Sequence, residues 1–185
     1  IAKLNSNGDS SNINASPTSL NLTSQSFNEN LKNNSIISTI STTDQNINQS
    51  HSYSFVEGDG SYDNKSFTVE GNNLKINKSP DYETKSSYSV FLKTTDSKGL
   101  SYSEVLNFNV NDVNEFPIDI SLSVESFNEN ISSDSTIAII STSDEDSSDT
   151  HTYSFVDGDG DSDNAYFTIE GSDLMISVSP DYETK

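Results

Sequence analysis

Short runs in which apolar and polar residues alternate recur along the chain. The clearest runs lie at 53–55, 67–69, 74–76, 88–92 and 106–110. A period of two residues is typical of a β-strand with one buried face. Clusters of Gly, Asn, Asp and Ser separate the runs, and no segment shows the 3.6-residue period of a useful helix. The pattern therefore predicts an all-β fold, with six or seven short strands packed as an antiparallel sandwich.

The chain contains one structural unit written twice. Residues 20–85 align with 120–185 without a gap, and about half of the aligned positions are identical. The segment SPDYETK occurs at 79–85 and again at 179–185. Such self-similarity indicates tandem copies of one module.

Prolines at equivalent positions, Pro17 and Pro117, mark the expected starts of the two units. They predict a polar linker or disordered lead-in at 1–16, a complete repeat at 17–116 and a C-terminally truncated repeat at 117–185. The truncated repeat lacks counterparts of the last two predicted strands of the first. We therefore expect it to expose unpaired strand edges and part of its core.

Charge and composition narrow the classes of partner. The formal net charge is −20, with no arginine; residues 1–117 carry 13 acids and 8 lysines, whereas 118–185 carry 16 acids and one lysine. Such a surface disfavours nucleic acid and anionic membranes and attracts cations. There is no cysteine, which excludes disulfides and thiolate chemistry. No apolar run is long enough for a transmembrane helix.

Acidic residues recur at particular places in the two units. The candidate set comprises Glu29, Asp81, Glu83, Asp112, Asn114 and Glu115, followed by Asp144 and Asp146. On an extended chain, side chains two residues apart point the same way, so Asp81 and Glu83 are expected to share a face. Because the ends of alternate strands meet at the poles of a sandwich, the whole set is predicted to converge at the junction between the units.

Gathering these acids without a cation would be costly. Two like charges about 4 Å apart repel by about 4 kcal/mol at an effective dielectric of 20. Five or six carboxylates in one place would rival the whole stability of a domain, about 5–15 kcal/mol. A hard divalent ion reverses the sign of this interaction, and a ligand set of oxygens alone favours calcium over zinc.

The ordered motifs resemble tandem cadherin-like repeats, especially the bacterial form found in large surface proteins. The matching segments are NEN at 28–30 and 128–130, DYE at 81–83 and 181–183, TTDSKG at 94–99, DVNEFP at 112–117 and DED at 144–146. The resemblance implies tandem Greek-key sandwiches of about seven strands each, with calcium bound between successive units and a role in cell-surface adhesion. By position it makes the candidate set above calcium ligands. It adds, as weaker candidates, Asp44, Asp96, Glu129, Asp181 and Glu183.

The chain departs from the animal pattern in several places. The linker is one residue shorter than D-x-N-D-N-x-P, and there is no tryptophan to carry strand-swap adhesion. At the upstream junction, the counterparts of Asp112, Asn114, Glu115 and Asp146 are Asn12, Asn14, Ala15 and Asn46. We therefore expect the upstream junction to bind calcium weakly or not at all.

Other groups receive structural interpretations. The acidic loop at 157–164 resembles the first half of an EF-hand loop, but Thr168 stands where a bidentate glutamate is needed. We interpret the loop as a turn, with an accessory ion site as the alternative. His51 and His151 are assigned local structural roles. No Ser–His–acid set, phosphate loop or thiol can be assembled, so we expect no enzymatic activity.

The favoured hypothesis is a calcium-rigidified extracellular rod in cell adhesion, anchored through parts of the protein outside this sequence. Calcium and neighbouring repeats are the expected partners. Another adhesin molecule, including a homophilic copy, or a surface glycan is the further partner that the sequence leaves open. The alternative is a spacer or carbohydrate-binding accessory module of a large secreted enzyme. An intracellular scaffold, which would show no calcium response, is the third hypothesis.

Overall fold

The computed structural model describes residues 13–184. It divides the chain into two compact units, Ile1–Val113 (unit 1) and Asn114–Lys185 (unit 2). Of the predicted lead-in at 1–16, residues 1–12 lie outside the described residues, and 13–16 form no strand. The division into repeats at 17–116 and 117–185 stays a prediction.

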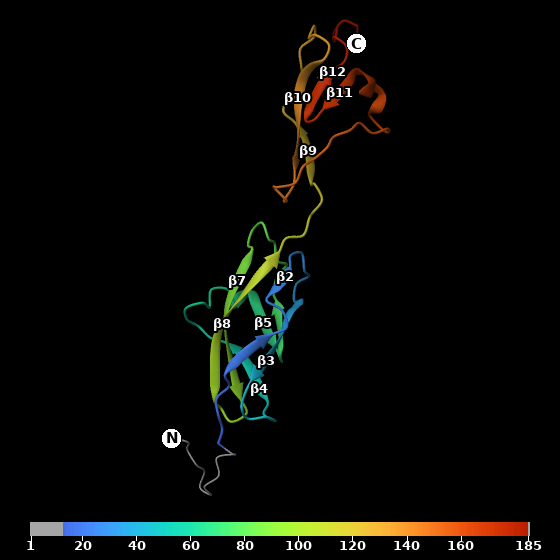
Figure 1. The fold of residues 1–185 in the computed structure, drawn as a ribbon. Coiled ribbons are helices and arrows are strands. Elements are labelled where there is room, and N and C mark those ends of the chain that lie inside the picture. Colours follow the sequence, from blue (N-terminus) through green and yellow to red (C-terminus); the bar gives the residue numbers. More distant parts are fainter. Residues whose placement is uncertain (1–12, 185) are drawn as a thin grey trace. The chain divides into compact units, whose positions relative to one another are not determined.

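Unit 1 is a sandwich of two four-stranded sheets (Figure 1). The first sheet contains, in spatial order, β1 (Ser19–Leu22), β3 (Ile36–Thr43), β6 (Asn73–Ile76) and β5 (Phe67–Glu70). The second contains β2 (Ser26–Asn28), β8 (Ser101–Asn111), β7 (Ser87–Asp96) and β4 (His51–Phe55). The chain crosses between the sheets after β1, β2, β3, β4 and β6. The predicted all-β Greek-key sandwich is confirmed.

The core of unit 1 lies between the two sheets and follows from the alternation in the sequence. Val90 and Leu92 in β7 are fully buried, and they meet Leu74 and Ile40 from the opposite sheet. Phe108 in β8 is 1% exposed. Residues between these positions face outward, as expected for strands with a period of two.

Two short strands, β1 and β2, open unit 1 in different sheets, so its described part has eight strands where the sequence predicted six or seven. β1 pairs antiparallel with β3, whereas β2 pairs in parallel with β8 in the other sheet. Side-chain hydroxyls occupy the crossing: the backbone N–H of Ser24 donates to Ser38 Oγ at 3.1 Å, and Ser24 Oγ donates to the carbonyl of Ser26 at 2.6 Å. The crossing matters for function because β2 delivers Glu29 to the end of β8.

Unit 2 contains a single four-stranded sheet among its described residues (Figure 1). Its spatial order is β11 (Phe167–Glu170), β12 (Asp173–Ile176), β10 (Ser135–Ser143) and β9 (Asp119–Leu122). Apolar side chains that the sandwich would cover are exposed, among them Ile120 at 64% and Phe127 at 43%. The sequence predicted this exposure, because the last two strands have no counterpart in unit 2.

Two segments adopt strands in unit 1 and no strand in unit 2, although their sequences are nearly the same. SFNEN at 26–30 contains β2, but the identical residues at 126–130 form no strand. HSYSF at 51–55 forms β4, but HTYSF at 151–155 does not. In unit 1 these segments pair with β8 and β7, respectively. The pairing partner, not the local sequence, therefore decides whether these segments become strands.

The acidic loop at 157–164 forms a turn that leads into a short 3₁₀ helix, Asp161–Tyr166. The Asp161 carboxylate accepts a hydrogen bond from the backbone N–H of Gly158 at 2.8 Å, and Asn164 Nδ2 donates to the carbonyl of Val156 at 3.1 Å. Gly160 has a φ of 94°, in the left-handed region that glycine tolerates. These bonds favour the interpretation as a turn. A second 3₁₀ helix, Asn64–Ser66, lies at the equivalent place in unit 1.

Candidate metal centre

A buried glutamate organises the end of unit 1 at which β8 finishes. Glu29 is only 3% exposed, and its backbone N–H donates to the carbonyl of Asn111 at 3.1 Å. Its two carboxylate oxygens accept from the backbone N–H groups of Val113, at 2.8 Å, and Tyr82, at 2.7 Å. Glu29 thus fastens both the exit of β8 and the PDYE segment to the end of β2.

The PDYE segment is a turn, so the prediction that Asp81 and Glu83 lie on extended chain is wrong. The Asp81 carboxylate accepts from the backbone N–H of Thr84 at 2.7 Å and from its hydroxyl at 2.8 Å. These local bonds compete with strand geometry and close the turn. The two acids nevertheless converge, because the turn folds them back toward Glu29.

Glu29, Asp81 and Glu83 each offer a carboxylate oxygen, and these oxygens lie within 4.8 Å of one another. Asp112 belongs to the same end of the unit, because Glu29 bonds to both of its chain neighbours. We call these four residues the C-terminal pole of unit 1. Calcium binds oxygens at about 2.3–2.6 Å, so two ligands of one ion stand about 5 Å apart or less. The spacing and the oxygen-only donor set therefore fit calcium.

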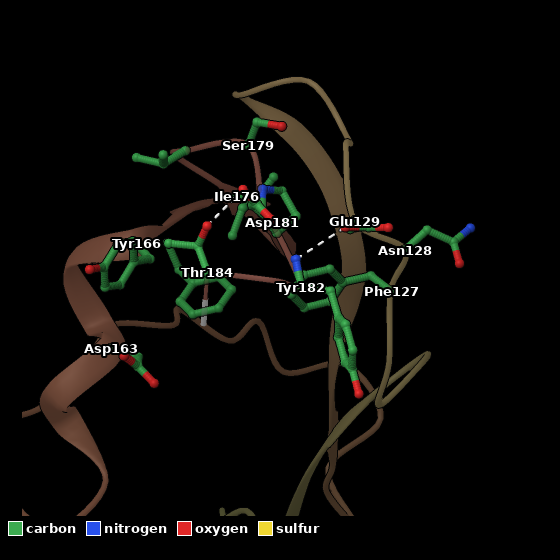
Figure 2. Close-up of a pocket in the computed structure, with 13 residues that line it drawn as sticks. Phe127, Asn128, Glu129, Asp163, Tyr166, Ile176, Ser179, Asp181, Tyr182 and Thr184 are labelled. Carbon is green, nitrogen blue, oxygen red and sulfur yellow. Dashed lines mark hydrogen bonds between the residues drawn. The ribbon is translucent and has the colours of Figure 1, made fainter.

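Unit 2 repeats this acidic group in a more open form. Glu129, Asp181 and Glu183 also bring carboxylate oxygens within 4.8 Å of one another, but all three residues are exposed. The backbone N–H of Tyr182 donates to Glu129 at 3.1 Å (Figure 2). The Thr184 hydroxyl donates to Asp181 at 2.8 Å, and this bond is the main cause of the lowered pKa of Asp181. Glu129 is exposed because no strand equivalent to β8 covers it.

The N-terminal end of unit 2 holds a second set of predicted ligands. The backbone N–H of Glu115 donates to the Asp146 carboxylate at 2.7 Å, and the backbone N–H of Asp146 donates to Asp144 at 3.1 Å. Asp146 is 7% exposed. Asn114 is exposed, and its Nδ2 donates to the carbonyl of Glu115 at 2.9 Å. These backbone contacts hold the linker against the acidic loop within unit 2.

Each histidine pairs with the first acid of the preceding loop in its unit, which is a local structural role; the sequence predicted such a role but did not identify the partner. His151 Nε2 lies 2.9 Å from the Asp144 carboxylate, and His51 Nε2 lies 3.1 Å from Asp44. The hydrogen bond from His151 lowers the pKa of Asp144 and keeps the carboxyl ionised. The signal was present in the sequence, because both units place a histidine seven residues after the aspartate.

At the N-terminal end of unit 1, side-chain amides contact the acids. Asn14 Nδ2 donates to the Asp96 carboxylate at 2.9 Å, and Gln49 Nε2 donates to Asn14 at 2.6 Å. Asn46 accepts from the backbone N–H of Ala15 at 2.7 Å, in the place where Asp146 accepts from Glu115 in unit 2. Among residues 13–184, no compact group of three acids forms at this end. The expected weak calcium binding here stays a prediction, and Asn12 lies outside the described residues.

Asp96 should make the stability of unit 1 depend on pH. Burial raises the pKa of Asp96, but donors from Asn14 and from the backbone of 98–100 outweigh it, so the pKa is lowered. A carboxyl with a lower pKa in the folded state contributes stability above its unfolded pKa, and that stability is lost as pH falls through the folded pKa. We therefore expect the urea midpoint of unit 1 to fall below about pH 4, the ordinary carboxyl range.

The substitution Asp96→Asn should flatten this part of the pH profile, measured through backbone amide signals of β7 and β8. Glu57→Gln, at an exposed position in unit 1, is the matched control and should keep the original profile. An unchanged profile for Asp96→Asn would assign the acid sensitivity to other carboxyl groups.

Solved structures of cadherin domains match the chain. The human protocadherin-24 EC1-2 structure has a TM-score of 0.64 at 19% identity, and the match covers 94% of this chain and 82% of that one. A structure of protocadherin gamma B7 extracellular cadherin domains 1-4 has a TM-score of 0.57 at 18% identity, covering 90% and 42%. That of the protocadherin gamma B4 extracellular domain has a TM-score of 0.54 at 22% identity, covering 90% and 28%.

No family model matches the chain, and no curated protein matches its sequence. The chain spans about two fifths of the gamma B7 structure and under a third of the gamma B4 structure. At these identities the matches establish the fold alone, which is the tandem cadherin-type β-sandwich. The acidic groups described above are features of this chain. None of the helices in the described residues has the length and hydropathy needed to cross a bilayer.

Proposed function

We propose that this chain is a calcium-binding segment of an extracellular adhesive rod, in which bound calcium stiffens the joint between two cadherin-like repeats. The observation that carries the proposal is the compact group of Glu29, Asp81 and Glu83, which the buried carboxylate of Glu29 holds at the end of unit 1. The cadherin-type fold supports a modular, non-enzymatic role. Cell-surface location and the bacterial type of repeat belong to the same proposal, supported by the motif set and the short DVNEFP junction.

The ligands we propose come from both units and share one short linker. Glu29, Asp81, Glu83 and Asp112 contribute from unit 1, and Asn114, Glu115, Asp144 and Asp146 contribute from unit 2. Asp112 and Glu115 are three residues apart, so chain connectivity alone limits their Cα separation to about 11 Å. Glu115 is in turn bonded to Asp146. A divalent ion at the linker would therefore reach carboxylates that each unit has already positioned.

The physical consequence is a joint whose stiffness depends on calcium. Without the ion, each pair of carboxylates about 4 Å apart repels by about 1 kcal/mol where water surrounds it and by about 4 kcal/mol at an effective dielectric of 20, which favours their separation. With the ion bound, the same groups become ligands, and their positions become coupled through it. Extracellular calcium modules have dissociation constants of about 10⁻⁴–10⁻³ M. The exposed group of Glu129, Asp181 and Glu183 and the weaker candidates Asp44 and Asp96 should contribute less.

Calcium titration of the full chain tests this function. Calorimetry should show binding in the millimolar range, and small-angle scattering should show a longer, stiffer particle on addition of calcium. Asp112→Ala and Asp144→Ala should each weaken binding by about tenfold or more, equivalent to about 1.4 kcal/mol. Asp59→Ala, which removes an exposed acid of a unit 1 loop, is the matched control and should bind as the parent does.

The outcomes separate the competing functions. No binding heat and unchanged scattering with calcium would contradict the rod proposal. Saturable binding to a glycan array without a calcium response would favour the accessory module of a secreted enzyme. Binding heat that survives both substitutions would place the ion elsewhere in the chain.

A further inference from the structure

Asn46 binds the segment that leads into β1 through both ends of its side-chain amide. Its Nδ2 donates to the carbonyl of Ile13 at 3.1 Å, and its Oδ1 accepts from the backbone N–H of Ala15 at 2.7 Å. Asp146, the counterpart in unit 2, also accepts from a backbone N–H, that of Glu115 at 2.7 Å. An ionised carboxylate has no N–H group, so it cannot make the second of these bonds.

Two further side-chain amides continue this network to the end of β7. Asn14 Nδ2 donates to one carboxylate oxygen of Asp96 at 2.9 Å, and Gln49 Nε2 donates to Asn14 Oδ1 at 2.6 Å. Asp96 is only 5% exposed, and its other oxygen accepts from the backbone N–H groups of Lys98 and Leu100 at 2.8 and 2.9 Å. We call the three side chains that supply these N–H groups the amide clasp: Asn14, Asn46 and Gln49.

The oxygens that the amide clasp contacts are of the kinds that calcium binds. They are the backbone carbonyl of Ile13, the carboxylate of Asp96 and the side-chain carbonyl of Asn14. Backbone carbonyls, carboxylates and asparagine side chains all serve as calcium ligands in proteins. Here each of the three oxygens accepts a side-chain N–H, so hydrogen bonds satisfy them without a metal ion.

The groups around the amide clasp also disfavour a cation. A hollow of about 380 Å³ lies beside it, and Lys98 is the charged residue among those that line the hollow: Asn14, Asn46, Gln49, Lys98 and Leu100. The lysine ammonium repels a divalent cation. The Asp44 side chain is 3% exposed, and its oxygens lie 2.8 Å from the backbone nitrogen of Asn46 and 3.1 Å from His51 Nε2. Asp44, like Asp96, is therefore already hydrogen-bonded within unit 1.

We propose that the amide clasp takes the place of a metal ion at the N-terminal end of unit 1 and fixes residues 13–15 to the sandwich without calcium. The clasp does not depend on the calcium function proposed above. A second consequence rests on that function: unit 1 responds to calcium at its C-terminal pole, whereas its N-terminal end keeps the same structure with and without the ion.

Hydrogen exchange of the backbone N–H of Ala15, measured on the full chain, tests the clasp. In calcium-free buffer this N–H should be protected, and addition of calcium should leave its exchange rate unchanged. Asn46→Ala removes both bonds of the Asn46 side chain and should speed the exchange by about tenfold or more. The backbone N–H groups of β7 and β8 should keep their exchange rates, which shows that the fold survives the substitution.

Asn46→Asp isolates the contribution of the side-chain N–H. It keeps an oxygen that can accept from Ala15, but it places a carboxylate oxygen beside the carbonyl of Ile13. Exchange at Ala15 should therefore speed up in calcium-free buffer and slow again when calcium is added, because a cation can bridge the two oxygens. Asn72→Asp is the matched control, since it adds the same charge at an exposed position of unit 1 and should behave as the parent does.

Three results would overturn the proposal. The first is protection of Ala15 in the parent only after calcium is added, which would mean that a metal ion orders the segment. The second is an unchanged exchange rate in Asn46→Ala, and the third is an Asn46→Asp variant that behaves as the parent does in both buffers. Protection of Ala15 without calcium supports the clasp even if calorimetry detects no calcium binding, so its failure and that of the proposed function are distinguishable.

Discussion

Replacing Phe27 by alanine is expected to lower the free energy of unfolding of unit 1 by about 3–5 kcal/mol. Phe27 is 6% exposed, and its ring contacts Tyr88 and Phe108, with centroids 6.0 and 6.1 Å away. Truncation removes the buried area of the ring and leaves a cavity that the flanking strands can fill only in part. Urea unfolding followed through backbone amide signals of β7 and β8 measures the loss for unit 1 alone.

The repeat supplies a matched control for this substitution. Phe127 has the same neighbours in sequence, but it is 43% exposed, because unit 2 has no counterpart of β7 and β8 to cover it. Phe127→Ala should therefore lower the stability of unit 2 by about 1 kcal/mol or less. Equal losses at the two positions would show that burial against β7 and β8 is not the source of the stability that Phe27 contributes.

Replacing Glu29 by alanine is expected to lower the stability of unit 1 by about 1–4 kcal/mol in calcium-free buffer. The substitution leaves the backbone N–H groups of Tyr82 and Val113 without the carboxylate that accepts from them, and hydrogen bonds to charged groups contribute about 1.5–3 kcal/mol each. Relief of repulsion between Glu29 and the exposed acids Asp81 and Glu83 offsets part of the loss, about 1 kcal/mol per pair at the dielectric of water.

Glu129→Ala is the matched substitution in unit 2. The structure gives exposed Glu129 a backbone hydrogen bond of 3.1 Å from Tyr182, so the cost should be about 1 kcal/mol or less. Glu29→Gln separates the two contributions, because it keeps one oxygen acceptor and removes the charge. If Glu29→Ala is no less stable than the parent without calcium, the carboxylate serves the metal alone and does not hold the pole together.

Much of the fold of unit 1 could be predicted from its sequence, because the buried positions alternate strictly. The alternating apolar residues of β7 predict that strand: Tyr88, Val90 and Leu92. Those of β8 do the same: Leu106, Phe108 and Val110. The crossing between sheets from β1 to β2 was not predictable from this pattern, since it depends on hydroxyl contacts to Ser38 and on the position of β8.

The residues of the acidic site could be predicted from the sequence, but the contacts that position them could not. Like-charge clustering and the repeat identified Glu29, Asp81 and Glu83 as candidates that belong together. No pattern in the sequence indicated that Glu29 would be buried or that Asp81 would close a turn with Thr84. Both features depend on contacts between residues far apart in the chain, or on local side-chain bonds that compete with the extended conformation. The absence of strands at 126–128 and 151–155 in unit 2 is also non-local, because these segments have no partner strand to pair with.

The parallel pairing of β2 with β8 has a consequence for biosynthesis. The residues that this ladder joins are separated by about 83 positions, as for Asn28 and Asn111. At translation rates of about 5–20 residues per second, Phe27 leaves the ribosome some 4–17 s before its partner strand exists. During that interval the nascent repeat holds apolar side chains without a sheet to cover them. The segment made by then, residues 1–111, carries 11 acids and 8 lysines, so its net charge gives little repulsion against aggregation, and the strongly acidic residues 118–185 follow only later.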